Sequence, residues 1–217
     1  MATASYRIIS AGESRSFATD HPLWSGAATG ADVVLIVGKD AGAAFRELRD
    51  AAGCVAVAVE LGMECLGVHT GEARGEEGSN VVGFARYRQG DAPPTNLVEL
   101  VRQPRTAEAA LSAARAVFEG CGLQVAVCAD VPGRIVDRLV RPYYNAALRR
   151  LDEGLATADD LDKTLKLGLG YPRGPIDVLD ATGLHHHFDV TQALYEAYGD
   201  PAYAPARRAR VAKQRQY

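Results

Sequence analysis

Histidine is the side chain best suited to transfer a proton near neutral pH, and this sequence contains five of them. His69 follows an apolar run at residues 54–61, in the segment LGVHTGE, where a loop after a strand could face a cleft. This placement makes His69 a candidate general base. A solvent-exposed loop histidine explains the same pattern and is the interpretation that we favour. His21, in TDHPLW, is interpreted as a turn residue for the same reason.

Three consecutive histidines, His185, His186 and His187, suggest metal binding at first sight. Consecutive helical residues point about 100° apart, so three such imidazoles cannot all hold one ion. We therefore expect the run to form a partly exposed start of a helix, and we predict no metal site. The four cysteines form no C-x-x-C pair, so neither a zinc knuckle nor a redox motif is predicted.

Dinucleotide binding requires glycines at a turn from a strand into a helix, because the pyrophosphate approaches the main chain there. The candidate segment RIISAGESRS contains only Gly12, and WSGAATGAD spaces Gly26 and Gly30 differently from G-x-G-x-x-G. Only about 20 residues separate the first two predicted strands, whereas a βαβ unit needs about 30. The usual form of NAD binding is therefore not predicted.

The overall composition is that of an ordinary globular protein. The 217 residues suit one large domain or two small ones, and a hydrophobic fraction of 47% allows a buried core. The net charge of −3 favours neither nucleic acid nor a membrane as a partner. We find no signal-peptide pattern and no apolar run of about 18 residues, and we expect a cytoplasmic, reducing environment.

Strand and helix patterns alternate in the first 130 residues, and helical patterns follow. Runs of β-branched residues predict strands at 5–10, 31–38, 54–61, 80–87, 96–103 and 123–130, with helices at 41–53 and 106–122. Further helices are predicted at 133–152, from Thr157 onward and over 176–200. Pro142 lies inside the first of these and removes a hydrogen bond to the carbonyl of Arg138. We predict an α/β domain over 1–130 and a helical domain over 131–217.

Three strings resemble segments of 3-hydroxyacyl-CoA dehydrogenases and occur in the family order. They are NLVELVRQPRTAEAAL, ADVPGRIVDRLVRPYYNAALRRLDEG, which resembles the family's D-x-P-G-F-I-V-N-R segment, and ADDLDKTLKLGLGYPRGPIDVLDATGL. The resemblance is clear over about residues 80–200, weaker back to residue 31, and absent from 1–30. It implies an α/β then all-α fold: a reduced Rossmann-like sheet followed by a helical 6-phosphogluconate/3-hydroxyacyl-CoA dehydrogenase C-terminal-type domain.

Members of this family oxidise 3-hydroxyacyl-CoA with NAD, using a His base, a Glu that orients it, and Ser and Asn at the substrate oxygen. The resemblance places Glu99 at the position of the Glu, Asp137 at that of the Asn and Ala85 at that of the His; the Ser-containing string has become VELGMECLG, which has no Ser. Alanine cannot accept a proton, and an ionised Asp only accepts hydrogen bonds. Our preferred interpretation of Asp137 is a helical ion pair with Arg141, four residues on.

For two further groups of residues, both a structural role and a functional role are compatible with the sequence. Lys166 and Tyr171 lie in the best-matched stretch, where fold maintenance is favoured over ligand contact. The basic tail at residues 207–215 could meet a CoA phosphate or an acidic partner, but a frayed, solvated terminus is the favoured interpretation.

We therefore expect a pseudo-enzyme without a bound cofactor that forms a homodimer or heterodimer through its helical domain, with acyl-CoA as the candidate ligand. One alternative is an active NAD-dependent dehydrogenase with an unusual loop near Gly12. That alternative requires His69 and Glu99 to face one cleft. The other alternative is a purely structural partner subunit.

Overall fold

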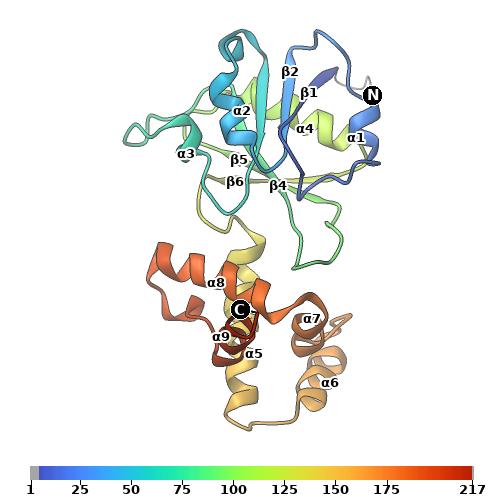
Figure 1. Ribbon diagram of the computed structural model, residues 1–217, viewed down its shortest axis with the longest axis vertical. Helices are drawn as coiled ribbons and strands as arrows, with labels where there is room; N and C mark the ends of the chain where they lie inside the picture. Colours follow the sequence, from blue (N-terminus) through green and yellow to red (C-terminus); the bar gives the residue numbers. More distant parts are fainter. Residues whose placement is uncertain (1–4, 217) are drawn as a thin grey trace. The chain divides into compact units, whose positions relative to one another are not determined.

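The computed structural model describes residues 5–216, and the chain divides into two compact units (Figure 1). The sheet unit contains the described residues up to Arg88 together with Pro94–Arg134. The helical unit contains Gln89–Pro93 together with the described residues from Ile135 onward. A short segment that follows the fourth strand therefore belongs to the helical unit.

Six strands form one sheet whose spatial order is the order along the chain. All neighbouring pairs are parallel except the antiparallel pair β4 and β5. Each strand lies within two residues of its predicted bounds: β1 Tyr6–Ser10, β2 Val33–Val37, β3 Ala56–Glu60, β4 Val81–Arg86, β5 Leu97–Arg102 and β6 Gln124–Ala129.

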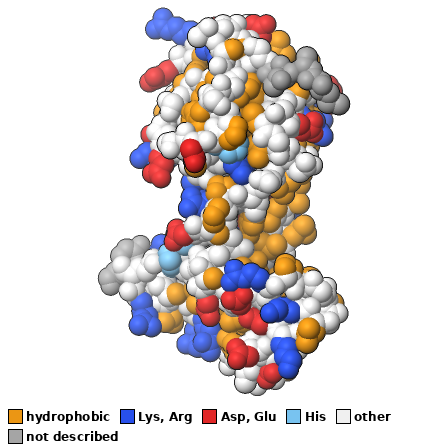
Figure 2. Space-filling model, turned by 90° about the vertical axis from the view of Figure 1, so that its right-hand side faces the viewer, with side chains coloured by type: hydrophobic (Ala, Val, Ile, Leu, Met, Phe, Trp, Pro, Cys, Tyr) orange, Lys and Arg blue, Asp and Glu red, His pale blue; other side chains and the backbone are white. Residues whose placement is uncertain are grey.

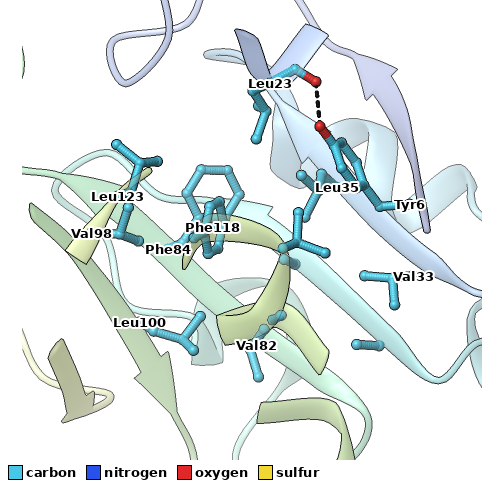
Figure 3. Close-up of a cluster of buried hydrophobic side chains, with 14 of the residues drawn as sticks. Tyr6, Leu23, Val33, Leu35, Val82, Phe84, Val98, Leu100, Phe118 and Leu123 are labelled. Carbon is cyan, nitrogen blue, oxygen red and sulfur yellow. Dashed lines mark hydrogen bonds between the residues drawn. The ribbon is translucent and has the colours of Figure 1, made fainter. Parts of the chain in front are cut away.

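Helices cover both faces of this sheet (Figure 1). Helix α4, Glu108–Gly120, packs Phe118 against Phe84 of β4 on one face (Figure 3). Helix α2, Ala41–Glu47, covers the other face, which explains why every residue of β2 and β3 is buried. Two four-residue helices, α1 at Pro22–Ser25 and α3 at Gly67–Thr70, complete the α-helices of this unit.

The sheet is a shortened form of the doubly wound dinucleotide fold. That fold has the strand order 3-2-1-4-5-6, and its ligand crevice opens where the order reverses, between strands 1 and 4. Among the described residues the order does not reverse: β1 is an edge strand beside β2, and the residues between them contain only helix α1. The prediction of a reduced Rossmann-like sheet is confirmed.

The helical unit consists of five α-helices: α5 Val136–Asp152, α6 Ala158–Leu169, α7 Pro175–Thr182, α8 Leu184–Tyr198 and α9 Arg207–Gln214. Helix α6 begins at the predicted place, and Thr157 caps it: its hydroxyl accepts a hydrogen bond from the Asp160 amide at 3.1 Å. Acidic and basic side chains are interspersed over the face of this unit that Figure 2 displays. No helix of the described residues is both long and apolar enough to cross a membrane.

The basic tail is ordered as helix α9, so the expectation of a frayed terminus was wrong. Arg207 and Arg208 both donate to the Asp152 carboxylate, at 2.8 and 2.7 Å. Lys213 donates to Asp189 of α8 at 2.8 Å. Three basic side chains of the tail therefore form ion pairs with two carboxylates of the helical unit.

The YPRGP turn between α6 and α7 is held by one carboxylate. Asp162 of α6 accepts the amides of Ile176 and Asp177 at 2.9 and 2.8 Å, and so caps the first turn of α7. A side chain at Gly174 would lie 2.2 Å from the Asp162 carboxyl group. This local packing explains why the best-matched string of the sequence has glycine there.

Pro142 lies in the middle of α5 and has no amide hydrogen to donate. The carbonyl that loses its partner is that of Arg138, one turn earlier. The buried hydroxyl of Tyr203 donates to this carbonyl at 3.2 Å. A side chain from a distant segment thus replaces the missing main-chain bond.

We predict that Tyr203→Phe lowers the free energy of unfolding by about 1 kcal/mol, because the Arg138 carbonyl loses its donor. The same substitution in a Pro142→Ala background should cost much less, since an alanine at that position restores the main-chain amide. Urea denaturation of the four proteins measures this double-mutant cycle. Tyr195→Phe, at an exposed tyrosine of α8, is the control. An equal cost of Tyr203→Phe in both backgrounds would contradict the role of this hydroxyl.

Candidate functional site

The carboxyl ends of β1, β2 and β3 meet at the edge of the sheet where α/β proteins bind ligands. Glu60, the last residue of β3, is buried at this edge. Its carboxylate accepts the Ser14 hydroxyl and the Ser16 amide, each at 2.9 Å, and the Gly38 amide at 2.7 Å. These donors form a cradle of the kind that binds an anion, and a carboxylate of the chain itself occupies it.

Main-chain contacts also close the space between the loops that follow β1 and β2. The Asp40 amide donates to the Ala11 carbonyl, and the Lys39 amide donates to the Glu13 carbonyl, both at 2.9 Å. A side chain at Gly38 would lie 2.2 Å from the Ala11 carbonyl oxygen. In the doubly wound fold, dinucleotides bind beyond the carboxyl ends of parallel strands such as these.

Ala85 and Glu99 are direct partners across the antiparallel strands β4 and β5, and both are buried. The position that the resemblance assigns to the base therefore does face the acid that would orient it. The Glu99 carboxylate instead lies 3.4 Å from the Arg134 guanidinium, which also donates to the Gly62 carbonyl at 3.1 Å. Arg134 stands where the family string has Phe, and that departure was the sequence signal for this ion pair.

Cys128 of β6 lies close enough to Glu99 for the charge of that carboxylate to act on its thiol. Burial, and then the negative charge of Glu99, raises the pKa of its thiol to about 11. The thiol therefore stays protonated near neutral pH and is a poor nucleophile. Cys128 is therefore also a poor candidate for a general base beside Glu99.

His69 lies at the end of α3 and is largely buried, contrary to the expectation of an exposed loop residue. Its Nε2 lies 3.4 Å from the Glu64 carboxylate. Its Nδ1 is buried without a hydrogen bond, and the ring packs so closely on Gly42 of α2 that a side chain there would clash. The contacts of His69 are therefore with Glu64 and α2, whereas Glu99 contacts Arg134.

Asp137 forms the predicted ion pair with Arg141: the guanidinium donates to the Asp137 carboxylate at 2.7 Å, and both residues are buried. Arg141 also lies 3.2 Å from Nδ1 of His187, whose Nε2 lies 3.0 Å from the Asn145 amide oxygen. Because Arg141 can only donate, Nδ1 accepts and Nε2 carries the proton. Asn145 in turn donates to Thr191 at 2.8 Å. Asp137 is thus one end of a buried polar network.

Burial, and then the positive charge of Arg141, lowers the pKa of His187 to about 3. His187 therefore stays neutral at physiological pH. It packs between α5 and α8, so the expectation of a partly exposed residue is wrong for His187.

The helical unit contains an apolar groove of about 610 Å³. Its lining includes Leu139, Val140, Tyr143, Tyr144, Tyr171 and Val178. The Tyr143 hydroxyl is buried without a hydrogen bond, and burial, followed by the proximity of Tyr171, raises its pKa to about 12. Tyr171, from the best-matched string, packs edge-on against Tyr143. Lys166 instead lines a separate polar hollow with Asp159 and Asp162.

Comparison with protein-family models matches residues 133–216 to the 3-hydroxyacyl-CoA dehydrogenase C-terminal domain. A 3-hydroxybutyryl-CoA dehydrogenase of Bradyrhizobium diazoefficiens is 36% identical over 113 residues, which cover 52% of this chain and 39% of that protein. The mitochondrial hydroxyacyl-coenzyme A dehydrogenase of Sus scrofa is 40% identical over 106 residues, 49% of this chain and 32% of that protein. The matched region thus spans less than two thirds of these relatives.

Solved structures extend the similarity to most of the chain. The (S)-3-hydroxybutyryl-CoA dehydrogenase PaaH1 from Ralstonia eutropha superposes with a TM-score of 0.70 at 25% identity, covering 86% of this chain and 66% of that one. FadB2 of M. tuberculosis superposes with a TM-score of 0.71, also at 25% identity, covering 87% of this chain and 67% of that one. Both units of the chain therefore have counterparts.

We predict that His187 makes stability depend on pH between about 6.5 and 3. Its pKa is lower in the folded state than in the unfolded chain, so falling pH protonates the unfolded state first, and stability decreases by up to about 1.4 kcal/mol per pH unit. Urea unfolding of the His187→Gln variant should show a slope that is shallower by about this amount. His186→Gln controls for the loss of a histidine from the same helix. An unchanged slope in His187→Gln would contradict the assignment.

Proposed function

Because the chain belongs to the 3-hydroxyacyl-CoA dehydrogenase family, we propose that it binds acyl-CoA thioesters through its helical unit and does not transfer hydride to NAD by itself. The observation that carries this proposal is the pairing of Glu99 with Arg134 opposite Ala85. The acid that would orient a base is paired with a guanidinium, and the residue facing it cannot accept a proton.

The edge of the sheet supports the same proposal for the cofactor. A dinucleotide pyrophosphate placed at the ends of β1 and β2 would meet the Glu60 carboxylate. Two like charges about 4 Å apart repel by about 4 kcal/mol at the effective dielectric typical of protein sites. The hydrogen bonds between the Ala11–Glu13 and Lys39–Asp40 segments would also have to break. The charge repulsion and the loss of these hydrogen bonds both oppose binding of NAD at the place where the family binds it.

The apolar groove of the helical unit supports thioester binding. Leucine, valine and tyrosine side chains line most of it, and such surfaces hold acyl chains by removing apolar area from water. The proposed roles of these side chains are limited to binding: Leu139 and Val140 contact the acyl chain, and the Tyr143 ring adds apolar surface to the groove. No step of bond making or breaking is assigned to the groove.

Calorimetric titration of the purified chain with acetoacetyl-CoA, and separately with NADH, tests this proposal. We expect saturable heat with acetoacetyl-CoA and none with NADH. Leu139→Asp should abolish thioester binding, because it places a charge in the groove. Leu155→Asp should not, because Leu155 is similarly exposed but does not line the groove.

Micromolar NADH binding would overturn the proposal and favour an active dehydrogenase with an unusual nucleotide loop. The absence of heat from both ligands would overturn the thioester part and leave a purely structural subunit. Unaltered acetoacetyl-CoA binding by Leu139→Asp would show that the groove is not the binding site.

We further propose that the helical unit self-associates through leucines at the end of α6. Leu167 and Leu169 are 77% and 63% exposed, whereas leucine is usually among the most buried residue types. The family resemblance, which implies dimerisation through the helical domain, supports a second copy as the partner. A complete dehydrogenase of the family is the alternative partner.

Sedimentation velocity tests the self-association. We expect a dimer for the native chain and a monomer for the Leu167→Glu/Leu169→Glu variant, since two buried carboxylates would oppose an apolar interface. A monomeric native chain at high micromolar concentration would contradict a homodimer.

A further inference from the structure

The three consecutive histidines at the start of α8 have different surroundings. His187 is buried in the polar network with Arg141 and Asn145. His185 and His186 are only half-buried, and their rings lie side by side with centroids 3.9 Å apart. Three consecutive imidazoles cannot bind one ion, but two of them can.

A carboxylate from a distant part of the sequence completes a cluster with these two rings. Asp91 belongs to the segment Gln89–Pro93, which forms part of the helical unit. Its Oδ2 lies 3.1 Å from Nε2 of His186. One nitrogen of each imidazole and one oxygen of Asp91 all lie within 4.8 Å of one another.

The two residues before Asp91 contact the helices of the helical unit. Gly90 has a φ of +54° and lies so close to the end of α7 that a side chain would overlap the Thr182 carbonyl oxygen. The amide oxygen of Gln89 accepts the Tyr144 hydroxyl at 3.1 Å. The segment is therefore anchored on both α5 and α7, and it presents Asp91 to the two histidines.

We propose that Asp91, His185 and His186 bind one divalent transition-metal ion, with Zn²⁺ as the best match. Two imidazoles and one carboxylate suit Zn²⁺, whereas Ca²⁺ and Mg²⁺ prefer ligands that are all oxygen. Tetrahedral zinc needs ligand atoms roughly 3.4 Å apart. Asp91 and His186 already have about this separation, and a nitrogen of His185 lies within 4.8 Å of both ligand atoms.

Two electrostatic effects act on this site. Burial, and then the neighbouring His186, lowers the pKa of His185, so its imidazole is neutral and ready to bind a metal near neutral pH. The start of a helix is unfavourable for a cation, and the Asp91 charge opposes this effect. We expect affinity in the micromolar range, with water as the fourth ligand. The ion would join the Gln89–Pro93 segment to α8 and is independent of the function proposed above.

Calorimetric titration of the untagged, chelator-treated full chain with ZnCl₂ tests the site. We expect one ion per chain, with at least tenfold weaker binding in each of the variants Asp91→Asn, His185→Gln and His186→Gln. His21→Ala, at a histidine of the sheet unit, should bind as tightly as the native chain. Circular dichroism of each variant confirms that the fold is retained.

Visible absorption of bound Co²⁺ provides an independent measurement, since four-coordinate Co²⁺ absorbs strongly and the hydrated ion weakly. The native chain should develop this absorption, and the His185→Gln/His186→Gln variant should not. Absence of binding by the native chain would overturn the proposal. Equal Zn²⁺ affinity in the double variant would also overturn it, because the ion would then be held elsewhere, for example by cysteines.

Discussion

A carboxylate buried in the middle of a sheet needs a positive partner, and the ion pair of Glu99 with Arg134 meets this requirement in the sheet unit. Glu99 is 2% exposed. Breaking a buried pair of this kind by removing one member costs about 3–5 kcal/mol, because the other charge remains unpaired. With alanine across the strand at position 85, the guanidinium supplies the charge and the Gly62 carbonyl holds it in place. The ion pair with Arg134 therefore explains how a charged Glu99 can be buried in the interior of the sheet unit.

Charged side chains are also paired within the protein at positions where members of the family would bind cofactor or substrate. At the edge of the sheet, the Glu60 carboxylate accepts hydrogen bonds from the amides of Ser16 and Gly38. In α5, Asp137 stands at the family's Asn position and is paired with Arg141. Each of these groups has a protein partner, so neither needs a cofactor or substrate for its hydrogen bonds. The apolar groove is different, since its lining includes the exposed side chain of Leu139.

Features that depend on local sequence were predictable. Runs of β-branched residues gave the six strands, and the spacing of Asp137 and Arg141 on one helix gave their ion pair. The missing hydrogen bond at Pro142 was also foreseen, but the donor that replaces it, Tyr203, was not. Contacts between residues far apart in the chain depend on the tertiary fold. Arg134 with Glu99, Ser14 with Glu60, and Asp91 with His186 are of this type, and periodicity carries no information about them.

We propose that this chain keeps the fold of the 3-hydroxyacyl-CoA dehydrogenases and that ion pairs within the protein involve the residues at two of the family's catalytic positions, Glu99 and Asp137. The most direct test is a turnover assay of the purified chain with acetoacetyl-CoA and NADH, followed by NADH absorbance. A complete dehydrogenase added to the same sample afterwards shows that the substrates are sound. The account predicts no consumption of NADH above the rate without protein. Steady consumption by the native chain, abolished in a His69→Ala variant, would contradict it.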